Sequence, residues 1–287
     1  MSKLWDRALS LRTESDILRE FLAEFLGTLT FVVSQNIRIF FLFFYEDFFL
    51  MKFFFHQCLG CSSNAIMVVS GFNRFSLITG PLSWGLALTV AIYICGGVSG
   101  GHCNPAVSLG LASIKKFEWK KLLHYFLGQY LGAFVGSLLT YAVYNQTIDR
   151  LPGEMTWPIF GTRSLPEINA GSAFLDQLIS TMFFVMIICS LTDDDNPLRP
   201  SKGLLPITIG FVNFGSMIAS FGYNCGGPMN PARDLMPRLM TTMTGWKSTP
   251  FSDKHYNYFW IPFVACHLGG IIGCWLYRLM IGNHHRK

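Results

Sequence analysis

Two copies of one short stretch decide the fold: Gly101-His102-Cys103-Asn104-Pro105-Ala106, and later Gly227-Pro228-Met229-Asn230-Pro231-Ala232-Arg233-Asp234. Asn is a strong helix N-cap, and Pro fits the first helical turn because its missing N–H would have no partner there. Each Asn-Pro-Ala is therefore predicted to begin a short helix. One copy alone would be only a capping sequence. Two copies at matching places between apolar stretches predict a repeated architecture.

The composition predicts an integral membrane protein. Of the 287 residues, 51% are hydrophobic and 14% are charged, with a mean hydropathy of +0.37. The formal charge of +5 does not indicate nucleic-acid binding, because the basic residues lie mainly at the chain ends and in short connections. The eight cysteines form no metal-ligand pattern. The sequence also has no paired nucleophile and base and no phosphate loop, so we predict no enzyme, metal site or cofactor.

Six apolar runs are long enough to cross a bilayer, which needs about 20 residues. They lie near residues 17–33, 77–98, 122–144, 170–191, 203–221 and 260–281. Two shorter apolar segments, residues 107–114 and 235–243, follow the Asn-Pro-Ala copies and are predicted to cross only half of the membrane. The fold class is therefore all-α, with six transmembrane helices and two half-spanning helices.

The repeat extends beyond the tripeptides. Glu24-x-x-x-Thr28 in the first run is echoed by Gln177-x-x-x-Thr181 in the fourth. A carboxylate in a membrane helix is costly unless it faces the protein interior, which marks Glu24 as a hydrogen-bonding or functional group. Glycines at 132 and 136 in the third run are echoed by glycines at 269, 270 and 273 in the sixth, and their small-residue spacing predicts close helix packing.

Three spans in each half make the repeats inverted, because the second half must enter the membrane from the opposite side. Basic residues after the first half-helix and at the C-terminus predict that both ends are cytoplasmic. The predicted organisation is a tail at 1–16, a channel domain at 17–282 with halves at 17–145 and 170–282, and a tail at 283–287. Asn145 begins a glycosylation sequon so near the third helix that its modification is doubtful.

The two half-helices are predicted to meet with their N-termini near the membrane midplane. Each N-terminus contributes roughly half a positive charge and unpaired N–H groups. Asn104 and Asn230 add amide donors, and Arg233 adds a full positive charge on the outer side. A neutral hydroxylic molecule gives its oxygen to these donors, whereas a cation is repelled. The pattern therefore favours a pore for neutral solutes.

These residues resemble the aquaporin superfamily. The resemblance covers Glu20 to Ile281 apart from one Phe-rich segment, and it is carried by residues 99–107 together with Asn230-Pro231-Ala232-Arg233. The family implies one pore in each protomer of a homotetramer, with glycerol, water and other small neutral solutes as its cargo and no cofactor. We expect a multi-pass protein of the plasma membrane.

Three residues resemble the glycerol-conducting branch of that family. Asp234 follows Arg233 directly, where water-selective members usually carry a smaller polar residue. Trp84 lies where glycerol channels place an aromatic wall of the narrow filter, although an interfacial Trp is the alternative reading. Pro262 in the last helix is also similar to that branch. The resemblance implies an aquaglyceroporin.

The predicted filter departs from the family at two places. Ile218 stands where glycerol channels usually have Gly and water channels His, and Gly227 stands where many glycerol channels have a second aromatic residue. The hypothesis is that Ile218 supplies the apolar bulk that Gly227 lacks, opposite Arg233. The midplane set is Asn104, Pro105, Ala106, Asn230, Pro231 and Ala232. The filter set is Trp84, Ile218, Gly227 and Arg233, and the supporting set is Glu24, Gln177 and Asp234.

Several alternatives stay open at this point. Residues 34–57 form an atypical Phe-rich insert, which could be a splicing product or a real extension, and which could give a non-conducting isoform. A water-selective channel is disfavoured by Asp234, Trp84 and the absence of a filter His. A secondary transporter can also be built from inverted repeats and broken helices, but Glu24 is the chief coupling carboxylate available at membrane depth.

Overall fold

The computed structural model describes residues 15–33, 76–150, 152–218, 222–246, 248–254 and 256–285. The predicted N-terminal tail up to residue 14, the insert at 34–57, Cys58, Cys61, Arg286 and Lys287 lie outside the described residues.

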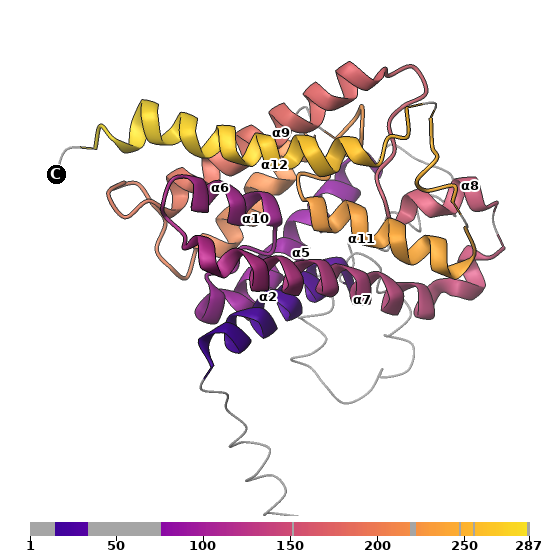
Figure 1. The fold of residues 1–287 in the computed structure, drawn as a ribbon, viewed down its shortest axis with the longest axis horizontal. Coiled ribbons are helices and arrows are strands. Elements are labelled where there is room, and N and C mark those ends of the chain that lie inside the picture. The colour runs from indigo at the N-terminus through magenta and orange to yellow at the C-terminus, as the bar shows by residue number, and fades with distance from the viewer. Residues whose placement is uncertain are drawn as a thin grey trace, which may run out of the picture.

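The described chain is helical, and its helices follow the predicted order (Figure 1). The long helices are α2 (Asp16–Val33), α5 (Ser76–Ser99), α7 (Leu122–Ile148), α9 (Ala170–Thr192), α10 (Leu205–Ser216) and α12 (Trp260–Tyr277). The two half-helices are α6 (Pro105–Ser113) and α11 (Pro231–Thr241), and a short helix α8 spans Gly153–Thr156. Single turns cover Trp119–Lys121, Trp157–Ile159, Thr242–Trp246 and Arg278–Gly282. Within the part of the chain that the structure describes, four helical segments, 78–99, 119–142, 170–192 and 260–282, are long and apolar enough to cross a membrane.

Two helix ends differ from the prediction. The fifth run was expected to reach residue 221; α10 ends as a regular helix at Ser216 and continues as a wider turn at 217–218, and residues 219–221 lie outside the described residues. The third run was expected to end near Tyr144, but α7 continues to Ile148, since its last residues contain no helix breaker. Asn145, the sequon residue, therefore lies inside α7.

Helices pack both within each half of the chain and between the two halves. Within the halves, α2 packs on α7 and α9 on α12. Between them, α5 packs on α10, α6 packs on α12, and α11 packs on α7. Figure 1 shows α6 and α11 in the middle of the bundle, between α12 on one side and α7 on the other. Each half-helix is thus held by the last helix of the opposite half, as an inverted repeat requires.

The backbone of the two central loops repeats in detail. Gly100, Gly101 and Cys103 have positive φ, and so do Gly226, Gly227 and Met229, at the same distances before the two asparagines. The φ of +67° at Gly101 and +49° at Gly227 lie in the left-handed region, which glycine enters without a steric penalty. Both loops are thereby turned toward the centre by the same means.

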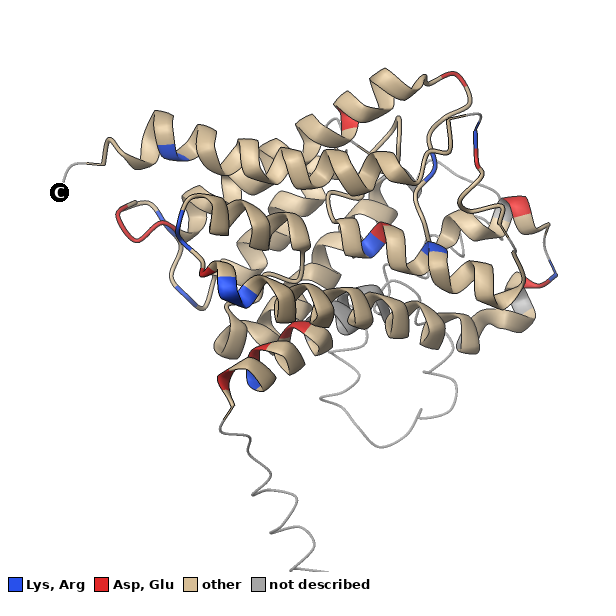
Figure 2. Ribbon diagram, in the orientation of Figure 1, with Lys and Arg blue, Asp and Glu red and all other residues tan. Residues whose placement is uncertain are grey.

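Charged residues gather at the two ends of the bundle, apart from those on α2 and a group on α11 (Figure 2). Lys116, Asp193, Asp194 and Arg278 lie together at one end, around the mouth of one cavity, and we call it the Lys116 end. The opposite end carries α8 and the loops that pack on it. A band of tan ribbon between the ends is the arrangement expected of a chain that spans a bilayer.

The glycines predicted to pack helices closely do so on α12. A Cβ placed on Gly269 would lie 2.4 Å from the carbonyl oxygen of Leu178, and one on Gly273 would lie 2.3 Å from that of Met182. Both contacts are with the backbone of α9, which cannot rotate away. Gly270 approaches the half-helix α6 in the same way, 2.4 Å from the oxygen of Ala106.

Replacing Gly269 with Ala is expected to lower the free energy of unfolding by about 1–3 kcal/mol, because the new methyl group meets backbone atoms of α9. The measurement is a denaturant titration in detergent, followed by circular dichroism. Gly215→Ala on α10 is the matched control, since a Cβ there has no neighbour within 4 Å. A Gly269→Ala protein as stable as this control would refute the packing role.

Candidate functional site

The two asparagines are tied to each other's loops at the centre of the bundle. Asn104 Nδ2 donates to the carbonyl of Met229 at 2.7 Å, and Asn230 Nδ2 donates to the carbonyl of Cys103 at 2.8 Å. Their Oδ1 atoms accept from the backbone N–H groups of Ala106 and Ala232 and so cap α6 and α11. The sequence predicted the caps and did not predict these reciprocal bonds. Each amide keeps a second N–H, and both asparagines line the cavity described below.

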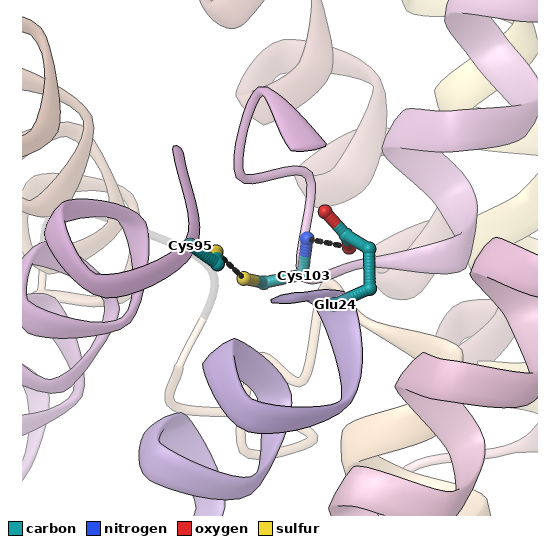
Figure 3. Close-up of side chains that lie close together, drawn as sticks. All are labelled: Glu24, Cys95 and Cys103. Atoms are coloured by element: carbon teal, nitrogen blue, oxygen red, sulfur yellow. Dashed lines mark hydrogen bonds between the residues drawn. The ribbon is translucent and has the colours of Figure 1, made fainter. Parts of the chain in front are cut away.

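Glu24 supports the first loop. Its side chain is fully buried, and its two carboxylate oxygens accept four hydrogen bonds. The donors are Ser99 Oγ at 2.6 Å, His102 N at 3.1 Å, Cys103 N at 2.7 Å and Gln129 Nε2 at 2.7 Å. Figure 3 shows the carboxylate turned toward the backbone of Cys103. These bonds stabilise the left-handed conformation of Cys103, which costs about 1–3 kcal/mol for a residue other than Gly.

Glu24 also belongs to a group of three potential metal ligands with Cys95 and Cys103, whose ligand atoms lie within 4.8 Å of one another (Figure 3). The two thiols are buried and 3.3 Å apart. However, all four hydrogen bonds to the carboxylate come from the protein itself, so a metal would have to displace them. The arrangement fits a support for the loop better than a metal site.

In the second half the carboxylate near the loop is that of Asp176, whose side chain is hydrogen-bonded with those of Cys225, Asn224 and Gln177. Gln177 Nε2 donates to Asp176 Oδ2 at 2.9 Å, while its Oε1 has no hydrogen-bond partner among the described residues. Unlike Glu24, Gln177 therefore accepts no hydrogen bond from the loop backbone among the described residues. The chain explains the difference, because Pro228 occupies the place that corresponds to His102 and has no N–H to donate. Asp176, next to Gln177, was missed by sequence reasoning.

Trp84 and Arg233 lie together on the side of the asparagines opposite the Lys116 end. The guanidinium carbon of Arg233 is 3.7 Å from the centroid of the Trp84 indole, and Arg233 Nη1 donates to the carbonyl of Phe160 at 3.0 Å. Both side chains are buried. Gly227 lies in the loop before α11 in the left-handed conformation.

Ile218 and Pro262 occupy different surroundings. Ile218 lies at the end of the α10 segment and is 42% exposed, and residues 219–221 after it are not described. Pro262 is buried in the first turn of α12. The placement of Ile218 in the filter stays a prediction.

Asp234 forms a buried ion pair with Arg238, one turn further along α11. Arg238 Nε donates to Asp234 Oδ2 at 2.7 Å, and Arg238 is completely buried. Asp234 Oδ1 also accepts from the N–H and hydroxyl of Thr162, and Arg238 donates to the carbonyls of Thr162 and Pro250. The pair thus fixes the loop whose Phe160 carbonyl binds Arg233.

A cavity of about 280 Å³ leads from the Lys116 end to the two asparagines. Its inner end is formed by Asn104, Met229 and Asn230, and its outer rim includes Lys116, Asp193 and Arg278. Apolar side chains line the space between; they include Leu88, Ile92, Val107, Phe184, Ile188 and Ile209. Trp84, Gly227 and Arg233 are not among its lining residues. The cavity combines an apolar wall with polar groups at its inner end, which suits a small solute that carries hydroxyl groups on a carbon skeleton.

Asp193 organises the rim of the cavity. Its carboxylate accepts from the Tyr277 hydroxyl at 2.9 Å and pairs with Lys116 at 3.4 Å, and His285 Nε2 lies 3.7 Å away. Burial by itself would raise the pKa of Asp193, but the hydrogen bond from Tyr277 and the charge of Lys116 outweigh it, so the pKa lies below its usual 3.8. The position of Asp193 in a run of three aspartates does not by itself predict this role.

The rim is expected to lose stability in acid. Because the folded-state pKa of Asp193 is depressed, its contribution is present above pH 3.8 and disappears as the pH falls through the folded pKa. We expect the thermal midpoint of the parent protein to fall more between pH 6 and pH 3 than that of Asp193→Asn. The difference between the two falls reports the stability that the ionised Asp193 carboxylate supplies. Equal falls in scanning fluorimetry would contradict this.

Comparisons with known proteins match this chain to members of a single family. The family model described as "Major intrinsic protein" matches residues 11–277. Aquaporin-9 of Rattus norvegicus is 35% identical over 96% of this chain and 87% of its own length, and aquaporin-10 of Homo sapiens is 33% identical over 96% and 85%. The solved aquaglyceroporin from Plasmodium falciparum superposes with a TM-score of 0.77 at 29% identity, over 93% of this chain and 98% of that protein.

Proposed function

The chain belongs to the major intrinsic protein family, and from that premise we propose that it is an aquaglyceroporin, a passive channel for glycerol, other small neutral solutes and water. It is an integral, multi-pass membrane protein and not a member of an enzyme family. The observation that carries the proposal is the cavity that ends at Asn104 and Asn230, where two helix N-termini meet.

The geometry suggests how a solute is selected at the centre. A hydroxyl oxygen accepts the free N–H of Asn104 or Asn230 while the carbon skeleton rests on the apolar wall. The helix N-termini behind both asparagines carry positive partial charge, so a cation entering the same place is repelled and a proton chain is interrupted. A neutral solute accepts hydrogen bonds from these donors without a charge penalty, which a cation cannot do.

We further propose that Trp84 and Arg233 form the narrow filter, with Ile218 and Gly227 as its other two members. In this structure the Arg233 guanidinium lies over the Trp84 indole. A solute that passes the filter therefore displaces this guanidinium and packs on the indole in its place. Such a cation–π contact is worth about 0.5–2 kcal/mol, which a passing solute can replace by its own contacts.

The proposed role of Ile218 has a direct measurement. Ile218→Gly is expected to raise water permeability relative to glycerol permeability, because it removes apolar bulk against which a carbon skeleton would pack. Stopped-flow light scattering on vesicles gives both rates from one preparation. Leu198→Gly is the control, since Leu198 is exposed in the loop between α9 and α10. An unchanged ratio would remove Ile218 from the filter.

The orientation and assembly are also proposals. Basic residues at the Lys116 end favour the cytoplasm for that end and for both termini. The Trp84–Arg233 pair then lies toward the outside. We propose a homotetramer in the plasma membrane, by analogy with the family's usual assembly.

The experiment that tests the function uses vesicles containing the full chain or a chain without residues 34–57, under water and glycerol gradients. Fast glycerol entry with both chains supports an aquaglyceroporin. Glycerol entry only after the deletion would make the full chain a non-conducting isoform, and water flux alone would assign it to the water-selective branch. Flux that saturates and depends strongly on temperature would instead indicate a carrier.

A further inference from the structure

Asp176 is a carboxylate inside the membrane-spanning segment 170–192, and no part of the proposed conduction path uses it. It lies in the second turn of α9 and is partly buried. A carboxylate at membrane depth is costly unless the protein supplies hydrogen-bond donors, so such a residue points to a function and a partner. The donors to Asp176 show which part of the chain it serves.

Two of the three donors belong to the loop that leads into α11. The side chains of Asn224 and Cys225 are hydrogen-bonded to the Asp176 carboxylate, and the third donor is Gln177 Nε2, 2.9 Å from Asp176 Oδ2. Cys225 is fully buried, so its thiol is held between the loop and α9. Asp176 therefore joins α9 to the loop residues that lie five and six positions before Asn230.

The second loop needs an anchor because its backbone is strained. Met229 adopts the left-handed conformation with a φ of +46°, as Cys103 does in the first loop. Such a conformation is unfavourable for residues other than glycine and persists only where the surroundings impose it. Hydrogen bonds to Glu24 do this for Cys103, whereas Gln177 Oε1 accepts none among the described residues. The second loop must therefore be fixed by other contacts.

We propose that Asp176 positions the second loop, as Glu24 positions the first. The two carboxylates act by different routes, since Glu24 accepts from backbone N–H groups and Asp176 accepts from loop side chains. A proline explains the change of route. Pro228 stands where the first loop has His102 and offers no N–H, so a carboxylate at position 177 would lose one of its two backbone donors. The chain instead carries a carboxylate one residue earlier and donors on loop side chains.

Asp176 acts on the solute through the loop and not by contact. Gly227, which we assigned to the filter, lies two residues after Cys225, and Asn230 lies three residues further on. A loop that loses its anchor relaxes toward the passage, which narrows it more for glycerol than for water. The inference thus rests on the proposed function, so its first measurement is one that does not depend on flux.

The first measurement is amide hydrogen exchange in detergent, read by mass spectrometry for the peptide that covers residues 222–230. In Asp176→Ala we expect this peptide to exchange about tenfold faster, the effect of one hydrogen bond to a charged group on a local opening equilibrium. The peptide around Cys103 is the internal reference, because its loop is held by Glu24. Glu167→Ala is the control variant, since Glu167 is an exposed carboxylate in the loop before α9. Equal exchange in Asp176→Ala and in this control would overturn the proposal.

Moving the carboxylate separates an anchor from a general loss of stability. A double variant, Asp176→Ala with Gln177→Glu, returns a carboxylate to the position that matches Glu24 in the repeat. There it can accept from the N–H of Met229, which corresponds to the N–H that Cys103 donates to Glu24 at 2.7 Å. We expect exchange in the second loop to slow again, toward the parent rate. Exchange as fast as in Asp176→Ala alone would mean that the loop does not depend on a carboxylate at this turn of α9, and would overturn the proposal.

Vesicle flux connects the loop to transport. We expect glycerol permeability to fall more than water permeability in Asp176→Ala, and the double variant with Gln177→Glu to recover the parent ratio. A parent chain that carries no glycerol, but whose loop exchanges faster in Asp176→Ala, would leave the anchor standing and overturn the transport proposal. Unchanged exchange in a chain that carries glycerol would do the reverse. Faster exchange with the parent's glycerol-to-water ratio would overturn the role of Asp176 in selecting the solute.

Discussion

Replacing Asp234 with Ala is expected to lower the free energy of unfolding by about 3–5 kcal/mol, the penalty for leaving a buried charge unpaired. Arg238 is 0% exposed, and its guanidinium would lose its only described carboxylate partner. The N–H and hydroxyl of Thr162 would lose their acceptor as well. The loop that carries Phe160 would then be released, and with it one hydrogen bond of Arg233.

The measurement is a denaturant titration in detergent, paired with the vesicle assay for glycerol. Asp194→Ala is the control, because it removes an ion pair with Arg199 that is exposed to solvent, and such pairs contribute about 0–1 kcal/mol. A double variant, Asp234→Leu with Arg238→Met, should recover much of the stability because no charge is left buried. If Asp234→Ala and Asp194→Ala cost the same, the buried pair does not hold the loop.

Glu24→Gln is expected to reduce stability by about 2–6 kcal/mol and to slow glycerol entry strongly. A glutamine has one carbonyl oxygen, which can accept two of the four hydrogen bonds that Glu24 now accepts. Two buried donors are left unsatisfied, at about 1–3 kcal/mol each. The N–H groups of His102 and Cys103 are among the four, so the loop that places Asn104 would lose its support.

The same two assays measure this variant. Asp16→Asn is the control on the same helix, because Asp16 is exposed and its ion pair among the described residues is a surface contact with Arg19. We expect it to match the parent in both assays. Should Glu24→Gln keep the parent's glycerol rate and stability, the carboxylate would not be what shapes the first loop.

The fold could be predicted from the sequence where local signals coincide. Asn104-Pro105 and Asn230-Pro231 each combine a cap with a residue suited to the first helical turn, and both half-helices begin there. The inverted repeat followed from the order of the apolar runs. The change from regular helix to a wider turn after Ser216 was not predicted, because Met217 and Ile218 are apolar and hydropathy alone does not mark such a change.

The site was less accessible to sequence reasoning because its contacts join distant residues. Arg238 lies one helical turn after Asp234, a spacing that could have revealed the ion pair. Nothing in the local pattern brings Phe160 to Arg233 or Tyr277 to Asp193, since these contacts depend on loops whose paths have no period. The weaker network at Gln177 follows from the missing N–H of Pro228, which could have been read by aligning the two halves.

The reciprocal amide bonds at the centre also set an order in biosynthesis. Asn104 and Met229 are 125 residues apart. At roughly 5–20 residues per second, a ribosome adds the carbonyl of Met229 about 6–25 s after Asn104. During that interval the first loop has no native acceptor for its asparagine, so the first half cannot complete its own pore lining. A nascent chain that stalls there exposes a polar segment with unpaired hydrogen-bonding groups within the membrane. Cellular quality control can recognise that segment until the second half is made.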